Sequence, residues 1–179
     1  MTTPHTALDA SFGGGSLNVV LHEPEIPQNT GNIARTCAAV GAHLHLIRPL
    51  GFSTSNRYLK RAGLDYWHLV EISYYDSIEE FLSLCGSAQV LLLTTKAPRA
   101  YTEVCYDKGC CLVLGKESSG LPLELLEAHR PWCVRIPMRE GARSLNLSNS
   151  AAIVIYEALR QLGFPSLQTK GTLLDGRRA

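Results

Sequence analysis

The stretch VRIPMREGARSLNLSNSAAIVIYEALRQL, residues 134–162, decides the fold predicted for this chain. It begins as a short apolar strand, continues as a charged loop that contains a glycine, and then enters a nearly apolar helix. Four polar residues gather where the loop becomes the helix: Ser144, Asn146, Ser148 and Asn149. Such side chains can accept hydrogen bonds from the unpaired N–H groups of a helix start. They therefore predict a helix cap, a binding site at the mouth of a buried helix, or both.

Upstream of this stretch, segments typical of strands and of helices alternate along the chain. The predicted strands are short apolar runs at 17–22, 43–48, 68–73, 89–95, 110–114 and 133–136. The predicted helices, besides the one that ends at Leu162, are 32–40, 56–62, 77–85 and 122–129, with 24–31 expected as a loop. Because strands and helices alternate, we predict an α/β fold with an open, mostly parallel sheet and helices on both faces.

Length and composition indicate one soluble globular domain. The chain has 179 residues, of which 45% are hydrophobic and 18% charged. We expect the domain at 17–164, a disordered tail at 1–16 and a flexible tail at 165–179. The start lacks the basic segment and apolar run of a signal peptide, so a cytoplasmic protein without a membrane segment is expected. The net charge of +1 does not by itself indicate a nucleic-acid partner, although a local basic patch could.

Cysteine and histidine usage does not suggest a metal centre. The six cysteines form no C-x-x-C pair, and the six histidines are scattered. Several cysteines lie inside apolar runs, where a free thiol behaves as a small buried hydrophobic group. We therefore predict no metal.

Three loops follow predicted strands late in the chain, after Leu93, after Leu114 and after Ile136. In open α/β sheets, ligands bind where such loops meet at the carboxyl ends of the strands. Gly115 and Gly120 would permit a sharp turn or a close backbone approach there. Neither G-x-G-x-x-G nor a P-loop lysine motif is present, which argues against a dinucleotide or nucleoside-triphosphate site.

Three sequence motifs carry a resemblance to a known class of enzymes. NTGNIARTCAA (29–39), LGKESSGLP (114–122) and IPMREGARSLNLSNSAAIVIYEALRQ (136–161) resemble the successive motifs of SPOUT RNA methyltransferases, which use S-adenosylmethionine. The similarity covers residues 17–164 in the same order. It is closest to the small enzymes that methylate the ribose 2′-oxygen of the tRNA wobble nucleotide, cytidine or modified uridine, with leucine tRNAs as expected substrates.

The resemblance implies a fold, an assembly and a cofactor site. It implies a deep trefoil knot in the C-terminal part, which no pattern of residues predicts because knots are nearly absent among folds. It also implies a homodimer whose active site draws on both subunits. S-adenosylmethionine, with S-adenosylhomocysteine as product, would be held in the knot by Leu93, Gly115, Ile136, Met138, Ser144 and Leu145.

The chemistry asks for groups that align a ribose hydroxyl with an already activated methyl group. Arg35, six residues after Asn29, is the first candidate; it could grip a phosphate and stabilise a developing alkoxide, or merely shield its helix. Ser144 and Asn146 match the S-x-N of the last motif, and could orient the ribose or the cofactor or only cap the helix. Glu117 could hold Asn29 or Arg35, or be a solvated loop residue.

Two basic groups are candidates for RNA contact. Arg57, Lys60 and Arg61 stand near the aromatic residues Tyr58, Tyr66 and Trp67, so cations could meet phosphate while rings stack on an unpaired base. Arg139 and Arg143 add charge at the expected cofactor mouth. The expected partner is a tRNA anticodon stem-loop, and the alternative is that these are solvated surface charges.

Two other functions remain open at this point. One is a SPOUT 2′-O-methyltransferase that acts on ribosomal RNA or on another tRNA position. The other is a non-catalytic RNA-binding protein on the same fold. In addition, Lys116 stands where many relatives carry proline, which leaves the geometry of that loop open.

Overall fold

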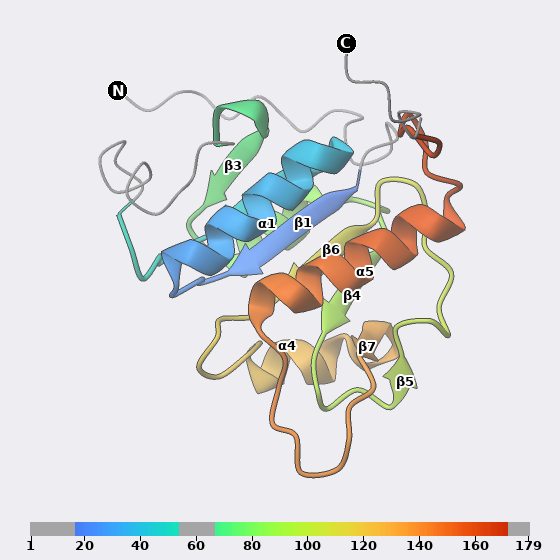
Figure 1. The fold of residues 1–179 in the computed structure, drawn as a ribbon. Helices are drawn as coiled ribbons and strands as arrows, with labels where there is room; N and C mark the ends of the chain where they lie inside the picture. Colours follow the sequence, from blue (N-terminus) through green and yellow to red (C-terminus); the bar gives the residue numbers. More distant parts are fainter. Residues whose placement is uncertain (1–16, 54–66, 172–179) are drawn as a thin grey trace.

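The computed structural model describes residues 17–53 and 67–171, which are built around a seven-stranded sheet in the order β3-β2-β1-β6-β4-β7-β5 (Figure 1). The strands are β1 (Asn18–His22), β2 (His43–Ile47), β3 (Ile72–Tyr75), β4 (Val90–Leu93), β5 (Arg99–Ala100), β6 (Cys111–Leu114) and β7 (Cys133–Arg135). Within these described ranges every strand pairing is parallel. The carboxyl ends of the strands therefore share one edge, as the sequence predicted.

Helices cover both faces of this sheet. They are α1 (Pro27–Val40), α3 (Ile78–Leu84), α4 (Leu123–Ala128) and α5 (Leu147–Gln161), with short 3₁₀ turns at Trp67–Leu69 and Arg130–Trp132. Helices α1 and α5 lie side by side on one face (Figure 1). The alternation of side chains along β1 shows how the two faces are filled. Val19 and Leu21 pack in the cluster that α1 and α5 complete, and Val20 packs with Phe81 of α3 and Leu126 of α4.

Helix α1 begins at Pro27 rather than at residue 32, so the prediction that 24–31 is a loop was wrong for its second half. Proline suits the first helical position, because its missing N–H is one that would be unpaired there anyway. The residue before the helix, Ile26, has no side chain that can cap it. The carboxylate of Glu117 accepts hydrogen bonds from the N–H groups of Glu25 and Ile26 instead.

Other boundaries differ in smaller ways. The strand predicted at 68–73 is shifted, because residues 67–69 form a 3₁₀ turn and β3 begins at Ile72. The short edge strand β5 was not predicted. The expected cap of α3 is confirmed, since Ser77 Oγ accepts the N–H of Glu80 at 3.1 Å. The helix predicted at 56–62 lies outside the described residues.

A buried chain of polar side chains links β1, β2 and β3 inside the sheet. His45 is fully buried, with Nδ1 3.0 Å from the hydroxyl of Tyr75 and Nε2 3.0 Å from Oδ1 of Asn18. Asn18 Nδ2 in turn donates to the carbonyl of Gly109 at 2.8 Å. Burial, and secondarily the neighbouring His43, lowers the pKa of His45 to about 2, so its ring is neutral at physiological pH.

The remaining expectations concern cysteines, metals and the chain ends. Five of the six cysteines are buried as free thiols and Cys105 is exposed. The part of the chain that the structure describes contains no group of three or more residues suited to hold a metal ion. No helix in that part is long and apolar enough to span a membrane. The domain limits 17–164 stay a prediction; within 165–171, Leu167 packs against the core.

Candidate active site

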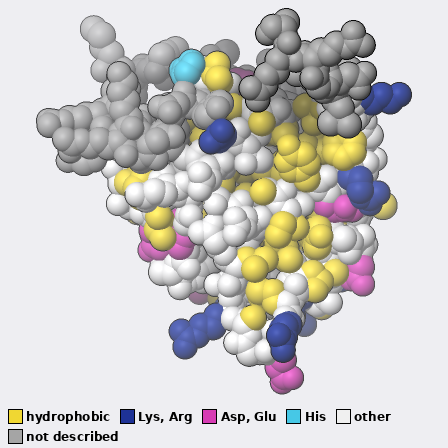
Figure 2. Space-filling view, viewed as in Figure 1, with side chains coloured by type: hydrophobic (Ala, Val, Ile, Leu, Met, Phe, Trp, Pro, Cys, Tyr) yellow, Lys and Arg dark blue, Asp and Glu magenta, His cyan; other side chains and the backbone are white. Residues whose placement is uncertain are grey.

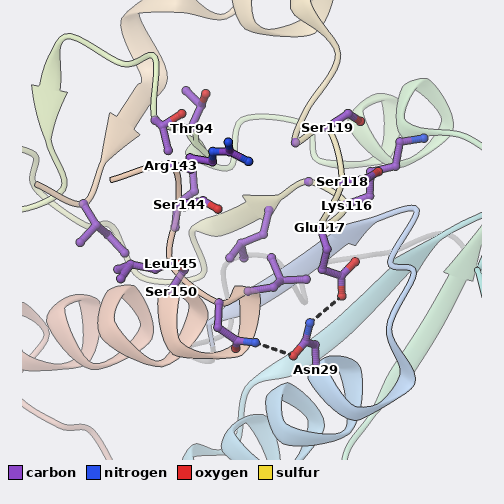
Figure 3. Close-up of a pocket in the computed structure, with 18 of the residues that line it drawn as sticks. Asn29, Thr94, Lys116, Glu117, Ser118, Ser119, Arg143, Ser144, Leu145 and Ser150 are labelled. Carbon is purple, nitrogen blue, oxygen red and sulfur yellow. Dashed lines mark hydrogen bonds between the residues drawn. The ribbon is translucent and has the colours of Figure 1, made fainter. Parts of the chain in front are cut away.

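A cavity of about 560 Å³ opens at the carboxyl edge of the sheet, where β4, β6 and β7 end beside the start of α5 (Figure 3). Its wall is built mainly by three segments, 93–95, 114–120 and 143–147. These are parts of the three loops on which the sequence placed a ligand site. The other lining residues are Ile26, Asn29, Val134, Ile136, Met138 and Ser150.

Every residue predicted to contact the cofactor lies in this wall. These six are Leu93, Gly115, Ile136, Met138, Ser144 and Leu145. The apolar part of the wall includes Leu114 and Val134, whereas Thr94, Ser118 and Ser119 contribute polar atoms. The cavity therefore suits a small molecule that has both apolar and polar parts.

The loop between β6 and α4 is closed on itself by two glycines. A Cβ atom on Gly115 would lie 2.2 Å from the backbone carbon of Gly120, so only glycine fits at this position. Gly120 has a φ of +73°, in the left-handed region, and its N–H donates to the carbonyl of Lys116 at 2.9 Å. The prediction of a sharp turn is confirmed, and the close backbone contact of Gly115 is with the loop itself.

A chain of hydrogen bonds joins the three sequence motifs at one side of the cavity (Figure 3). Asn29 Nδ2 donates to Oε1 of Glu117 at 2.9 Å, and Asn29 Oδ1 accepts from Nδ2 of Asn146 at 2.9 Å. Asn29 is 6% exposed, so its amide is held between these two partners. The Glu117 carboxylate also lies at the N-terminus of α1, where the helix dipole favours negative charge.

Asn146 serves two purposes that the sequence left as alternatives. Its Oδ1 accepts hydrogen bonds from the N–H groups of Ser148 at 2.9 Å and Asn149 at 3.3 Å, which caps α5. Its Nδ2 is thereby left to donate to Asn29. Ser144 takes no part in this cap and lines the cavity, with its side chain at the wall in Figure 3.

The predicted arginines are divided by the structure. Arg143 lines the cavity. Arg139 is exposed in the same loop, and Arg35 is exposed on α1; neither belongs to the cavity lining of one described chain. Arg57, Lys60 and Arg61 lie outside the described residues, as do Tyr58 and Tyr66, and only the backbone of Trp67 is described.

Sequence reasoning missed the ionic and polar contacts that two residues of the cavity wall make with Glu23 and Glu25. Lys116, which stands where many relatives carry proline, donates through Nζ to Oε2 of Glu23 at 2.7 Å. Ser118 donates to the carboxylate of Glu25 through its N–H at 2.9 Å and its hydroxyl at 2.8 Å. These bonds lower the pKa of Glu25, and the bond to Glu23 raises the pKa of Lys116. Each pair is about 93 residues apart in sequence, so no local pattern could have indicated it.

The arrangement offers fixed, uncharged hydrogen-bonding groups beside a cavity of ligand size. The volume of about 560 Å³ lies within the range of roughly 300–1,000 Å³ that is usual for small-molecule sites. Asn29, Asn146 and Ser144 can orient a hydroxyl or a carboxylate, and Arg143 adds positive charge at the wall. The residues present thus fit S-adenosylmethionine, the ligand that the resemblance implies.

Comparison with known proteins agrees with the geometry. The sequence model of the SpoU rRNA Methylase family matches residues 16–156. The tRNA (cytidine(34)-2′-O)-methyltransferase of Escherichia coli K12 is 45% identical over 150 residues, which cover 83% of this chain and 96% of that protein.

Two solved structures extend the comparison. A structure described as giving insights into the 2-OH methylation of C/U34 on tRNA is 47% identical, with a TM-score of 0.78, over 84% of this chain and 99% of that one. An AdoMet-bound rRNA methyltransferase from Sinorhizobium meliloti is 30% identical, with a TM-score of 0.73, over 83% of this chain and 57% of that one.

Proposed function

The chain belongs to the SpoU rRNA Methylase family and is a tRNA 2′-O-ribose methyltransferase, and we propose that it methylates the wobble nucleotide, position 34. The observation that supports methyl transfer at this site is the hydrogen-bonded chain Glu117–Asn29–Asn146 beside the cavity, and position 34 is supported by the relatives described for C34 and C/U34. It joins one residue from each of the three motifs. Cytidine is the proposed target base, and modified uridine is the alternative; leucine tRNAs stay a prediction.

S-adenosylmethionine is the proposed methyl donor, and it would supply a methyl group already activated by a sulfonium. The cavity fits it in size and in its division into apolar and polar walls. A relative 30% identical is described as AdoMet-bound, which supports the same donor here. The task left to this chain is then to bind the donor and to place a ribose hydroxyl in line with the methyl group.

The residues of the site divide that task. Asn146 is locked by its cap on α5 and by Asn29, so it can present a fixed amide to the ribose or to the donor. Ser144 can do the same from the opposite end of the segment 144–146. Arg35 offers a fork of N–H donors and no acceptor, so its proposed role is to grip a phosphate and stabilise the developing alkoxide rather than to act as a base.

A homodimer would explain how Arg35 reaches the reaction. Arg35 is exposed on α1 and lies outside the cavity lining of its own chain. The neighbouring face of α5 leaves Ile153 36% and Tyr156 48% exposed. Figure 2 shows hydrophobic side chains gathered over the face on which α1 and α5 lie. We propose that a second copy packs on this face and that each site takes Arg35 from the partner.

We also propose the knot that the family resemblance implies. Strand β7 lies between β4 and β5, although β4 and β5 are consecutive along the chain. The connection from β4 to β5 therefore crosses the place that β7 fills later in the chain. Such a crossing is compatible with the C-terminal trefoil knot that the family resemblance implies.

The remaining RNA contacts follow from the same proposal. An anticodon stem-loop would present its phosphates to Arg139 and Arg143 around the cavity, with Arg57, Lys60 and Arg61 as further predicted contacts. A tRNA substrate also agrees with the cytoplasmic location expected from the sequence. A second candidate, ribosomal RNA, is favoured by the Sinorhizobium meliloti relative, described as an rRNA methyltransferase.

Methyl transfer to two matched stem-loops tests the proposal. One carries cytidine at position 34, and the other carries 2′-deoxycytidine at that position alone. Labelled methyl should pass from S-adenosylmethionine to the first stem-loop and not to the second, because only the first has a 2′-oxygen there. Equal labelling of both stem-loops would contradict the position, and labelling of ribosomal RNA alone would favour the second candidate.

A further inference from the structure

Three consecutive residues of a loop in the cavity wall bind one short segment that leads into α1. Lys116 bonds to Glu23 at 2.7 Å, and Ser118 bonds twice to Glu25, at 2.8 and 2.9 Å. Between them, Glu117 bonds to the N–H of Glu25 at 2.8 Å and to Asn29 at 2.9 Å. The loop 115–120 is therefore fastened along most of its length to residues 23–29.

The bonds between Glu25 and this loop run in both directions. The Glu117 carboxylate accepts the backbone N–H of Glu25, and the Glu25 carboxylate accepts the backbone N–H and the hydroxyl of Ser118. We refer to these three bonds as the Glu25 clasp. Because the loop is closed on itself by Gly115 and Gly120, it has little freedom to deform. A displacement of the loop must then be passed to Glu25 and its neighbours.

The other side of the Glu25 backbone is equally confined. A Cβ atom on Gly51 would lie 2.7 Å from Cα of Glu25, and the N–H of Gly51 donates to the carbonyl of Pro24 at 2.9 Å. Glu25 is thus held between Gly51 and the loop. Glu25 therefore has little room to move away from the loop. A displacement of the loop would instead shift the residues that lead into α1.

The two ends of this connection belong to different binding events. At one end, Ser118 and Ser119 form part of the cavity wall that would contact the methyl donor. At the other end, α1 carries Arg35, which in the proposed dimer would grip the tRNA at the site of the other subunit. We propose that Glu25 is a positioning residue that couples donor binding to the placement of α1, so that donor and tRNA each strengthen binding of the other. This inference rests on the proposed function.

Glu25 is suited to a test because it is absent from the cavity lining, unlike Glu117. Glu25→Ala removes the bonds to Ser118 and leaves Glu117, Asn29 and the cavity wall chemically intact. Glu25→Gln should rescue the clasp, because its amide oxygen can accept the N–H of Ser118 while its amide nitrogen donates to the hydroxyl. Glu127→Ala, which removes an exposed glutamate of α4, is the matched control.

The experiment measures the affinity of a labelled anticodon stem-loop with and without saturating S-adenosylhomocysteine. In the wild type, the ratio of the two dissociation constants should lie in the range of about 5- to 150-fold that is usual for coupled sites. In Glu25→Ala it should fall below about 3-fold, with the melting temperature and the affinity for S-adenosylhomocysteine alone little changed. Glu25→Gln and Glu127→Ala should keep the wild-type ratio.

The outcomes separate this inference from the function on which it rests. If the wild type binds both ligands and methylates tRNA but Glu25→Ala keeps the full ratio, Glu25 has no coupling role and the function stands. A wild-type ratio near one has the same meaning. Loss of the ratio in Glu25→Gln as well as in Glu25→Ala would also overturn the clasp. If Glu25→Ala does not fold, Glu25→Asp, whose carboxylate lies one methylene farther from Ser118, replaces it and should lower the ratio. Failure of the wild type to bind S-adenosylhomocysteine would refute the function itself.

Discussion

Two hydrogen-bonded polar chains in this molecule resemble each other in chemistry and differ in surroundings. In the first, His45 lies between Asn18 and Tyr75 inside the sheet, and all three side chains are buried. In the second, Asn29 lies between Glu117 and Asn146 at the cavity. Asn29 is buried, as His45 is, but Asn146 is exposed and the cavity is open beside it.

The difference indicates which chain can act on a ligand. The groups around His45 are paired with one another in a dry interior, so they hold the sheet together and have no access to a substrate. In the chain around Asn29, the buried Asn29 fixes the geometry, whereas the exposed Asn146 is accessible from the cavity. A polar chain anchored at one end and open at the other is what a site needs in order to position a reactant. Changes in the two chains should therefore separate activity from stability.

The largest expected effect comes from Asn146→Asp. Aspartate caps a helix as well as asparagine does, so the start of α5 should persist. The donor to Asn29 is replaced by a charged oxygen that faces Asn29 Oδ1, and Asn29 cannot turn round without losing its bond to Glu117. Methyl transfer should fall by about 100-fold, the cost of a small misplacement of reacting groups. Single-turnover kinetics would measure this fall.

The same variant should lose about 1–3 kcal/mol of unfolding free energy at most, because only Asn29 Oδ1 is left without its donor. An unchanged turnover would mean that the hydrogen bond between Asn146 and Asn29 has no part in catalysis. A large loss of stability would mean that the cavity chain is as structural as the buried one, and the contrast between the two would then disappear.

A smaller effect is expected from His45→Ala, on stability rather than on activity. The change leaves Asn18 Oδ1 without its partner in the interior and removes the hydrogen bond between His45 and the Tyr75 hydroxyl, at about 1–3 kcal/mol each. The free energy of unfolding should fall by about 3 kcal/mol, while turnover per folded molecule stays near that of the wild type. Urea denaturation measures the first quantity. His68→Ala, at an exposed histidine, should change the stability by less than about 0.5 kcal/mol.

The smallest effect is the part of the pH dependence of stability that comes from His45. Burial lowers the pKa of His45 from 6.5 to about 2, so in mildly acidic solution the unfolded chain takes up a proton that the folded chain does not. Stability from this group is complete above pH 6.5 and is lost as the pH falls below that value. The difference in unfolding free energy between wild type and His45→Ala should shrink by about 1.4 kcal/mol per pH unit between about pH 6 and 5. Equal slopes in both proteins would contradict a neutral buried His45.

The sheet could largely be predicted from the sequence because its strands are apolar runs with clear ends. Cys111–Leu114 and Val90–Leu93 lie inside two such runs. Strand β5 was missed because Arg99–Ala100 is too short and too polar to form a run. The start of α1 was missed because Pro27 and Gly31 look like loop residues, while the carboxylate that satisfies the N–H groups before the helix comes from Glu117.

The candidate site could be predicted in part for a similar reason. Loops after parallel strands must meet at one edge, and so Gly115, Ile136 and Ser144 could be placed together. The contacts of Glu25 with Ser118 depend on how two distant loops pack, and charged residues in loops carry no local signal of a partner. Arg35 lies outside the cavity lining of its own chain, and its proposed role depends on a second copy, which the sequence of one copy does not place.

The place of β7 in the sheet has a consequence for how the protein is made. Strand β5 pairs, within the described residues, only with β7, which is synthesised more than thirty positions later. During synthesis, β5 therefore has no strand to pair with until Cys133–Arg135 has left the ribosome and formed β7 beside β4. A chain whose synthesis stops before residue 133 would lack β7, which is an inner strand of the sheet. It would expose the flank of β4 to pairing with other unfinished chains.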